Sequence, residues 1–324
     1  MRTHFRWQAQ RGPILPATFA CLLLAAPLLR GGQATEPDAA DSPARDGQTV
    51  CVALGAGGAN GLAHVPLLEV FDELGIRPRA ISGASVGAVV GALYASGMSA
   101  REIRRLILEY FVMPEEDLLE RLVSGEALRW MDFIEVELGD GGLLGSERFM
   151  SFLYKKLESR SFEELDIPLQ IVAADLWIRE EVIFESGELL PAIRASMALP
   201  GVFEPVANEG RVLIDGGAVN PVPWDLLPAD CDVTVAVDVS GVRTRPESDA
   251  SYFEVVFNSV KVMQQAIVAE KRRSAEPTLF LAPQIRDIRA LEFYRAERVF
   301  EQARASADEL RGRLRALQQA SSAN

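Results

Sequence analysis

Short apolar runs alternate with helical patterns in the first half of the chain. Val50–Leu54 is apolar and partly β-branched, and after a glycine loop it gives way to helical spacing that ends near Gly75. Residues 80–82 form a second short run, which turns through residues 83–87 into an apolar helical segment at residues 88–95. Strand, turn and helix repeated in this order predict an α/β fold with parallel neighbouring strands. The buried side of the first helix is marked by Leu62, Val65, Leu68, Leu74 and Ile76.

The rest of the body continues this pattern and then becomes helical. Residues 99–157 are amphipathic and mostly helical in pattern, and from Ser251 onward we expect mainly helices. Charges alternate along residues 287–319, which indicates a packed and solvated helix, with a lipid-facing role as the alternative. Further strands are predicted by three apolar runs, at residues 169–174, 212–214 and 233–239.

The amino-terminal segment has the pattern of a targeting signal. Residues 1–34 contain four arginines and no acidic residue, and they surround an apolar run at residues 14–29. Such a run is typical of a secretory signal peptide, and it is short for a helix that spans a membrane. We therefore expect residues 1–34 to be a signal peptide, residues 35–48 a linker, and the protein to be exported to the periplasm, cell envelope or medium. An uncleaved membrane anchor is the alternative.

Composition narrows the classes of partner and site. The 324 residues include 33 Lys and Arg against 46 Asp and Glu, a formal net charge of −13, so nucleic acid is an unlikely partner. Only two histidines are present, His4 and His64, which excludes a His-rich metal site, and we expect no metal and no cofactor. Cys51 and Cys231 each begin an apolar run; buried free thiols are favoured over a disulfide, although export would permit one.

The sequence Gly83-Ala-Ser85-Val-Gly87 is the strongest chemical signal. It lies where a predicted strand meets a predicted helix, the setting in which a serine on a sharp turn becomes an exposed nucleophile. The helix behind it offers a positive N-terminus to a developing oxyanion. In the alternative interpretation, Ser85 only caps the helix.

A base for Ser85 has to be a carboxylate. No histidine follows Ser85 in the sequence, and for His64, near the start of the first helix, packing or capping is favoured over catalysis. Asp215 is the best candidate because it follows a predicted strand and precedes Gly216 and Gly217, which leave it exposed on a turn. A turn aspartate alone is more often structural.

The glycine loop at residues 55–61 has two interpretations. It fails as a dinucleotide fingerprint, because Asn60 stands where the third glycine is required. It fits an oxyanion hole, because backbone N–H groups of Gly57, Gly58 and Ala59 can converge on a carbonyl oxygen at a helix start, with Gly55 and Gly61 supporting the loop.

Taken together and in order, these segments resemble the patatin-like phospholipase family. The carrying residues are 55–64, 81–87, 215–217 and the intervening stretch Ala192-Ile-Arg-Ala-Ser-Met-Ala-Leu-Pro-Gly-Val-Phe-Glu-Pro205, continued by residues 220–223. The resemblance implies a three-layer α/β/α domain with a largely parallel central sheet over residues 49–240, and we expect residues 241–324 to form a mainly helical extension packed on it. It also implies a serine acyl hydrolase that needs no metal, with Ser85 as nucleophile and Asp215 as base. Asn60 stands where the family usually has Arg or Lys.

The implied substrate is a lipid acyl ester, most simply a phospholipid or lysophospholipid, met in transient contact with a membrane or micelle surface. Apolar and aromatic side chains between residues 111 and 157 could line an acyl groove or lid, although ordinary core is favoured for most of them: Met113, Trp130, Met131, Phe133, Phe149 and Phe152. Two alternatives remain, a general carboxylesterase or thioesterase and a non-catalytic lipid-binding protein that kept the fold.

Overall fold

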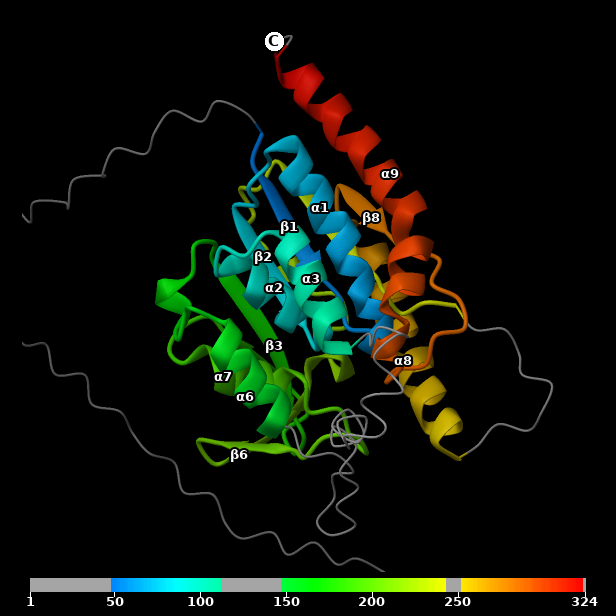
Figure 1. Ribbon diagram of the computed structural model, residues 1–324. Coiled ribbons are helices and arrows are strands. Elements are labelled where there is room, and N and C mark those ends of the chain that lie inside the picture. The colour runs from blue at the N-terminus through cyan, green and yellow to red at the C-terminus, as the bar shows by residue number, and fades with distance from the viewer. Residues whose placement is uncertain (1–47, 112–146, 243–251, 323–324) are drawn as a thin grey trace, which may run out of the picture. The chain divides into compact units, whose positions relative to one another are not determined.

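A mostly parallel sheet forms the centre of the protein in the computed structural model, which describes residues 48–111, 147–242 and 252–322 (Figure 1). Strands β8, β7, β1, β2 and β3 are parallel neighbours in that order, whereas β4 and β6 pair antiparallel with β3, and β5 pairs antiparallel with β6. The strands are β1 Val50–Leu54, β2 Ala80–Ala84, β3 Leu169–Asp175, β4 Glu181–Phe184, β5 Val206–Asn208, β6 Arg211–Asp215, β7 Val233–Val237 and β8 Leu279–Leu281.

Helices cover both faces of this sheet, which confirms the expected fold class. Along β1 the side chains alternate: Val50, Val52 and Leu54 join the core that contains α1, α2 and α9, whereas Cys51 and Ala53 join a smaller core with α8. The helices are α1 His64–Leu74, α2 Val86–Ala95, α3 Ala100–Phe111, α6 Glu147–Lys156, α7 Leu189–Ser196, α8 Tyr252–Ser274 and α9 Ala296–Ser322. Short 3₁₀-helices lie at Gly58–Ala63, Phe162–Glu164, Gly216–Ala218, Trp224–Leu226 and Phe293–Arg295.

The predicted runs coincide with β1, β2, β3, β6 and β7, but three short strands were not predicted. β4 is a hairpin strand of only four residues, Glu-Val-Ile-Phe, and β5 is a partly exposed hairpin strand of three residues with one large apolar side chain. β8 lies in the part expected to be mainly helical, yet it extends the sheet by pairing in parallel with β7. A run of three residues has no measurable periodicity, so only its neighbour in space identifies it as a strand.

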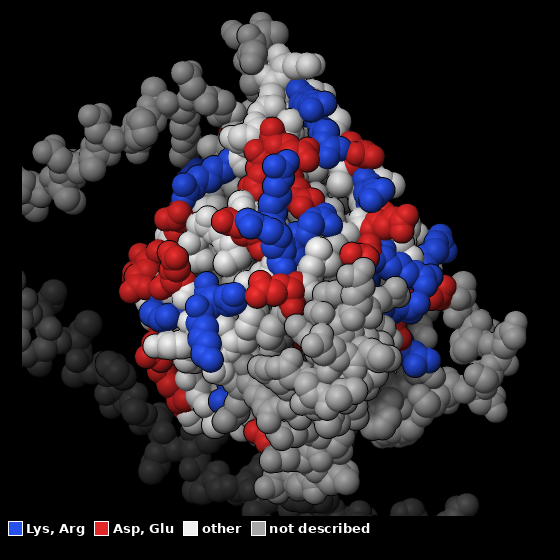
Figure 2. Space-filling view, viewed as in Figure 1, with Lys and Arg blue, Asp and Glu red and all other residues white. Residues whose placement is uncertain are grey.

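Helix α9 bears out the packing and solvation expected for the charged carboxyl-terminal pattern. Its apolar side, including Phe300 and Leu310, is buried against the core, and Arg311 pairs with Glu73 of α1. Figure 2 shows acidic and basic side chains interspersed over this face of the protein. No helix among the described residues is long and apolar enough to cross a membrane. The expected signal peptide, residues 1–34, lies outside the described residues.

A disulfide joins Cys51 and Cys231, so the expectation of two free thiols is wrong. The two Cα atoms lie 6.0 Å apart although the residues are separated by 180 positions in the sequence. β1 and β7 are parallel neighbours in which Cys51 pairs with Thr234, and this places Cys231 beside the beginning of β1. The pairing depends on strand order, which two isolated cysteines in a sequence do not reveal.

We expect the double variant Cys51→Ala/Cys231→Ala to lower the free energy of unfolding by about 2–5 kcal/mol, because it releases a long loop in the unfolded chain. Urea unfolding followed by circular dichroism measures this difference. Dithiothreitol should destabilise the wild type and leave the double variant unchanged. Equal sensitivity of both proteins to the reductant would contradict the prediction.

Candidate active site

Two strands meet end to end on one edge of β3, and this junction positions the site. Ala84 at the end of β2 pairs with Val172, and Asp215 at the end of β6 pairs with the next residue, Ala173. Both Val172 and Ala173 use their other edge to pair with β4. β2 and β6 therefore approach along the same edge of β3 from opposite directions. This junction brings together Ser85, which follows β2, and Asp215, the last residue of β6.

Ser85 occupies a strained turn between β2 and α2. Its backbone angles are φ 55° and ψ −125°, and its carbonyl accepts the N–H of Ala88 at 2.9 Å, which begins the helix. A positive φ is costly for a serine and is typical of a strand–turn–helix nucleophile. The turn also needs a glycine at position 87, because a Cβ there would lie 2.1 Å from the Leu54 carbonyl oxygen.

Asp215 lies on the expected turn, but its carboxyl group is buried, only 3% exposed, so the expectation of an exposed aspartate is wrong. Burial raises its pKa to about 6, and hydrogen bonds from the Ser85 side chain and the Gly217 N–H act in the opposite direction. The Gly217 N–H donates to Oδ1 at 2.7 Å and fixes the carboxylate at the turn. A carboxyl group with this pKa is ionised at neutral pH and is a stronger base than an exposed aspartate.

The glycine loop lies at the carboxyl end of β1, close to Ser85. Gly58 has φ +58°, and it lines the same cavity as Ser85. The Ala59 N–H already donates to the Ala290 carbonyl at 2.8 Å, so Ala59 is not an available donor. Among the loop and turn hydrogen bonds of the described residues, none has the N–H of Gly57 or Gly58 as its donor. These two remain as candidate donors to an oxyanion.

An apolar cavity of about 210 Å³ opens beside Ser85. It follows α2 from Val86 to Leu93, so at 1.5 Å per residue it extends about 12 Å from Ser85. Phe149 and Phe152 line it, whereas Met113, Trp130, Met131 and Phe133 lie outside the described residues. Further apolar lining comes from Leu62, Val89, Val90, Leu106, Ile107, Tyr110, Phe111, Leu153, Met197, Leu199, Phe203, Leu291, Phe293 and Tyr294.

Comparison with known proteins now identifies the family. The sequence profile described as patatin-like phospholipase matches residues 52–228, more than half of the chain. The chain belongs to the patatin-like phospholipase family. The matched residues contain the glycine loop, the turn at Ser85 and the Asp-Gly-Gly turn, which are the segments that meet at the strand junction. In the described residues of this patatin-like chain, no three His, Cys, Asp or Glu side chains are grouped to hold a metal ion.

Individual relatives match part of their length. An uncharacterized NTE family protein of Mycobacterium tuberculosis is 35% identical over 202 residues, which are 62% of this chain and 52% of that protein. The lysophospholipase NTE1 of Kluyveromyces lactis is 28% identical over 200 residues, 61% of this chain and 13% of the yeast protein. VipD from Legionella pneumophila, a solved structure, aligns with 82% of this chain and 67% of its own at 14% identity and a TM-score of 0.43. The chain thus spans about half the length of the mycobacterial relative.

Asn60 is the departure of this chain from the usual patatin-like pattern, and it is buried. Its Nδ2 donates to the Ser240 carbonyl at 3.1 Å. The same carbonyl accepts Lys261 Nζ from α8 at 2.6 Å. Asn60 and the ammonium group of Lys261 therefore bind the same carbonyl oxygen, although Lys261 lies about 200 residues later in the sequence. No local pattern could have pointed to Lys261.

His64 has the packing role that was expected of it. It is fully buried, and its Nε2 lies 2.8 Å from the Gly55 carbonyl oxygen at the start of the glycine loop. Burial lowers its pKa to about 4, so the ring is neutral at physiological pH. The neutral ring donates through Nε2–H and ties the loop to α1.

Ser196 supports the turn at Ser85, a role that the sequence motifs did not predict. It is buried at the end of α7, and its Oγ accepts the Ser85 N–H at 2.8 Å. Ser196 lies in the stretch from Ala192 to Pro205 that carries the family resemblance, but no local pattern in this stretch indicates which backbone group its hydroxyl meets. Gln264 of α8 is a second such residue, because its Nε2 donates to the Gly217 carbonyl at 3.1 Å.

We expect Ser196→Ala to lower the free energy of unfolding by about 1–3 kcal/mol, because it leaves the Ser85 N–H without an acceptor. Misplacement of Ser85 should also slow its labelling by a fluorophosphonate about tenfold or more. Urea unfolding and the labelling rate, followed by mass spectrometry, measure the two effects. Ser151→Ala, at an exposed position on α6, is the matched control. Wild-type labelling of Ser196→Ala would rule out a positioning role.

Proposed function

We propose that this protein is a serine acyl hydrolase of the phospholipase or lysophospholipase type. The observation that carries the proposal is the meeting of β2 and β6 on β3, which places Ser85 beside the buried carboxyl of Asp215. The apolar cavity at Ser85 and the membership of the patatin-like phospholipase family support it.

In the proposed mechanism a single carboxylate serves both halves of the reaction. Asp215 accepts the proton of Ser85 Oγ while the oxygen attacks the ester carbonyl, and the N–H groups of Gly57 and Gly58 stabilise the oxyanion. As the intermediate collapses, the proton passes from Asp215 to the leaving alcohol. Asp215 then takes a proton from water, which attacks the acyl-enzyme, and returns that proton to Ser85 Oγ as the fatty acid leaves.

The cavity favours an acyl chain as the group bound beside Ser85. The cavity of about 210 Å³ is lined almost entirely by aliphatic and aromatic side chains and follows α2 for about 12 Å, so it can hold several methylene groups of an acyl chain. A lipid ester uses this apolar space fully, whereas the short acyl group of a soluble ester would leave most of it empty. This difference separates a lipase from a general carboxylesterase or thioesterase.

The disulfide supports the further proposal that the protein is exported. Disulfides persist in oxidising compartments such as the periplasm or the extracellular medium, and the Cys51–Cys231 bond joins strands of the central sheet. The basic and apolar leader at residues 1–34 fits the same route. The intact mass of the protein recovered from a cell envelope fraction tests the proposal, and a full-length mass in the cytoplasm would contradict it.

We expect Ser85→Ala and Asp215→Asn each to reduce hydrolysis of lysophospholipid by at least about 10³-fold, because nucleophile and base act as one unit. Release of fatty acid by the purified protein measures the rate, with a chelator present throughout. Ser151→Ala is the control for a serine that takes no part. Equal rates in all four proteins would rule out the dyad, and a wild type that cleaves only short p-nitrophenyl esters would favour the carboxylesterase alternative.

The buried base sets the pH dependence of both activity and stability. Because the ionised form of Asp215 is the active one and its pKa is about 6, kcat/KM should rise with pH and reach half of its plateau near pH 6. The pKa is higher in the folded than in the unfolded chain, so ionisation costs stability as pH rises from about 4 to about 6.

Asp215→Asn should therefore be inactive yet more stable than the wild type at pH 7.5, by up to about 3 kcal/mol, and no more stable at pH 4. Urea unfolding at the two pH values measures the difference. A variant that is destabilised at both values would show that the Asp215 carboxylate stabilises the fold.

A further inference from the structure

The turn between β3 and β4 holds two large apolar side chains out of the protein. Trp177 is 75% exposed and Ile178 is 59% exposed. The turn is ordered from inside: the buried carboxylate of Asp175 accepts the Trp177 N–H at 2.9 Å and the Ile178 N–H at 3.0 Å. A hydrogen-bonded turn that exposes a tryptophan and the isoleucine after it indicates a contact surface.

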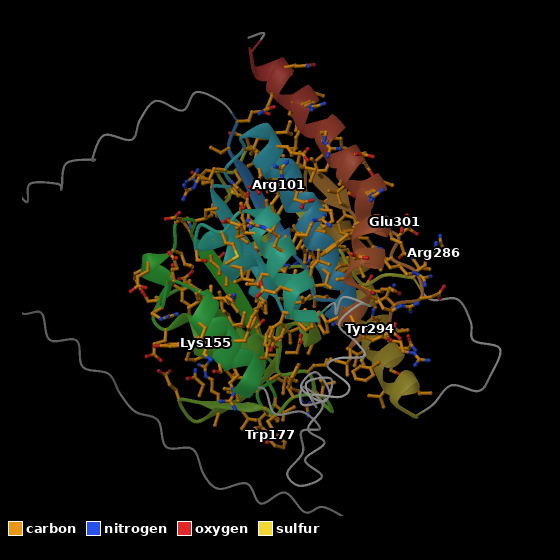
Figure 3. The ribbon with its side chains drawn as sticks, viewed as in Figure 1. Arg101, Lys155, Trp177, Arg286, Tyr294 and Glu301 are labelled. Atoms are coloured by element: carbon orange, nitrogen blue, oxygen red, sulfur yellow. A yellow bond between two sulfur atoms is a disulfide. The ribbon has the colours of Figure 1, made fainter. Side chains whose placement is uncertain are left out.

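Strand register places this turn at the same end of the sheet as Ser85, because both follow the carboxyl ends of parallel strands. β2 ends at Ala84, which pairs with Val172, and β3 continues for three more residues to Asp175. At about 3.3 Å per residue the turn begins about 10 Å beyond the end of β2. Figure 3 shows Trp177 at the lower edge of the protein, below Arg101 and Glu301 in this view.

The cavity beside Ser85 has an apolar rim of its own. Leu291 and Tyr294 line this cavity, and they are 42% and 52% exposed. Figure 3 shows Tyr294, like Trp177, in the lower half of the protein. The exposed apolar turn and the apolar mouth of the cavity thus belong to the same end of the molecule, where the strands β2 and β3 finish.

We propose that Trp177 and Ile178 dock the protein on the surface of a zwitterionic lipid aggregate, with the cavity mouth toward the lipid. The proposal rests on the proposed function, since an acyl chain must pass from the aggregate into the cavity. Tryptophan is suited to the boundary between headgroups and acyl chains, where its ring is buried and its N–H stays hydrated. Arg179, the next residue, is exposed and can extend its guanidinium toward phosphate groups.

The charge of the chain favours zwitterionic over anionic lipid. A formal net charge of −13 opposes attraction to an anionic surface, so binding has to come from apolar insertion. The turn loses little conformational freedom on insertion, because Asp175 already fixes its backbone.

Sedimentation with phosphatidylcholine vesicles tests the proposal, with Ser85→Ala as the background so that the lipid is not consumed. Adding Trp177→Ala and Ile178→Ala should lower the partition coefficient about tenfold or more. The matched control is Tyr154→Ala: this aromatic side chain is 53% exposed but lies under the Arg160 guanidinium, 4.0 Å from it, and its removal should leave binding unchanged.

In the active protein, the same two substitutions should reduce hydrolysis of vesicle phospholipid in parallel with binding and leave hydrolysis of a short p-nitrophenyl ester within twofold of the wild type. Vesicle binding that the two substitutions leave unchanged would overturn the proposal. If the substitutions also convert a dimer to a monomer on size exclusion, the surface is a contact with a second copy of the chain. If the wild type hydrolyses no lipid, the proposed function fails, but the docking proposal is still tested, because vesicle binding is measured on the Ser85→Ala background, which does not need activity.

Discussion

The site depends on one constraint of the sheet: a single edge of β3 serves two strands in succession. β2 uses the first part of this edge and β6 the second, and neither can be longer without displacing the other. Both chains must therefore leave the sheet at the junction, which is why each continues into a tight glycine turn. A Cβ at Gly216 would lie 2.1 Å from the Val172 carbonyl oxygen, so the packing of the turn against β3 admits no other residue. The close packing of β2 and β6 on one edge of β3 therefore determines both the strand order and the positions of Ser85 and Asp215.

At the junction, the ionised form of Asp215 is buried at a cost in stability. Its carboxyl is buried where a neutral group would be more stable, and the same burial raises its pKa, which suits the base of the proposed mechanism. Hydrogen bonds from the Ser85 side chain and the Gly217 N–H offset only part of this cost, and Gln264 holds Gly217 in place through its carbonyl. The disulfide and the packed core contribute stability that offsets the cost of burying this carboxylate.

Local patterns predicted the elements whose signal is local. The strands β1 and β2, the turn at Ser85 and the turn at Asp215 are each specified by neighbouring residues, because apolar runs and small turn residues act within a few positions. Contacts made across the sheet were not predictable: the Cys51–Cys231 bond, the Ser196 contact to Ser85, and Lys261 beside the loop all join residues that are remote in sequence. Periodicity says that a residue is buried, but not which residue it meets.

The position of β1 between β2 and β7 has a consequence for the order in which the protein can be assembled. All five of its residues are buried, yet its pairing with Val233–Val237 cannot form until more than two thirds of the chain has been synthesised. Until then one edge of an apolar strand stays open to other chains, a template for aggregation. Completion of the sheet therefore waits for β7, and a chain interrupted before β7 is left with one edge of its central strand unpaired.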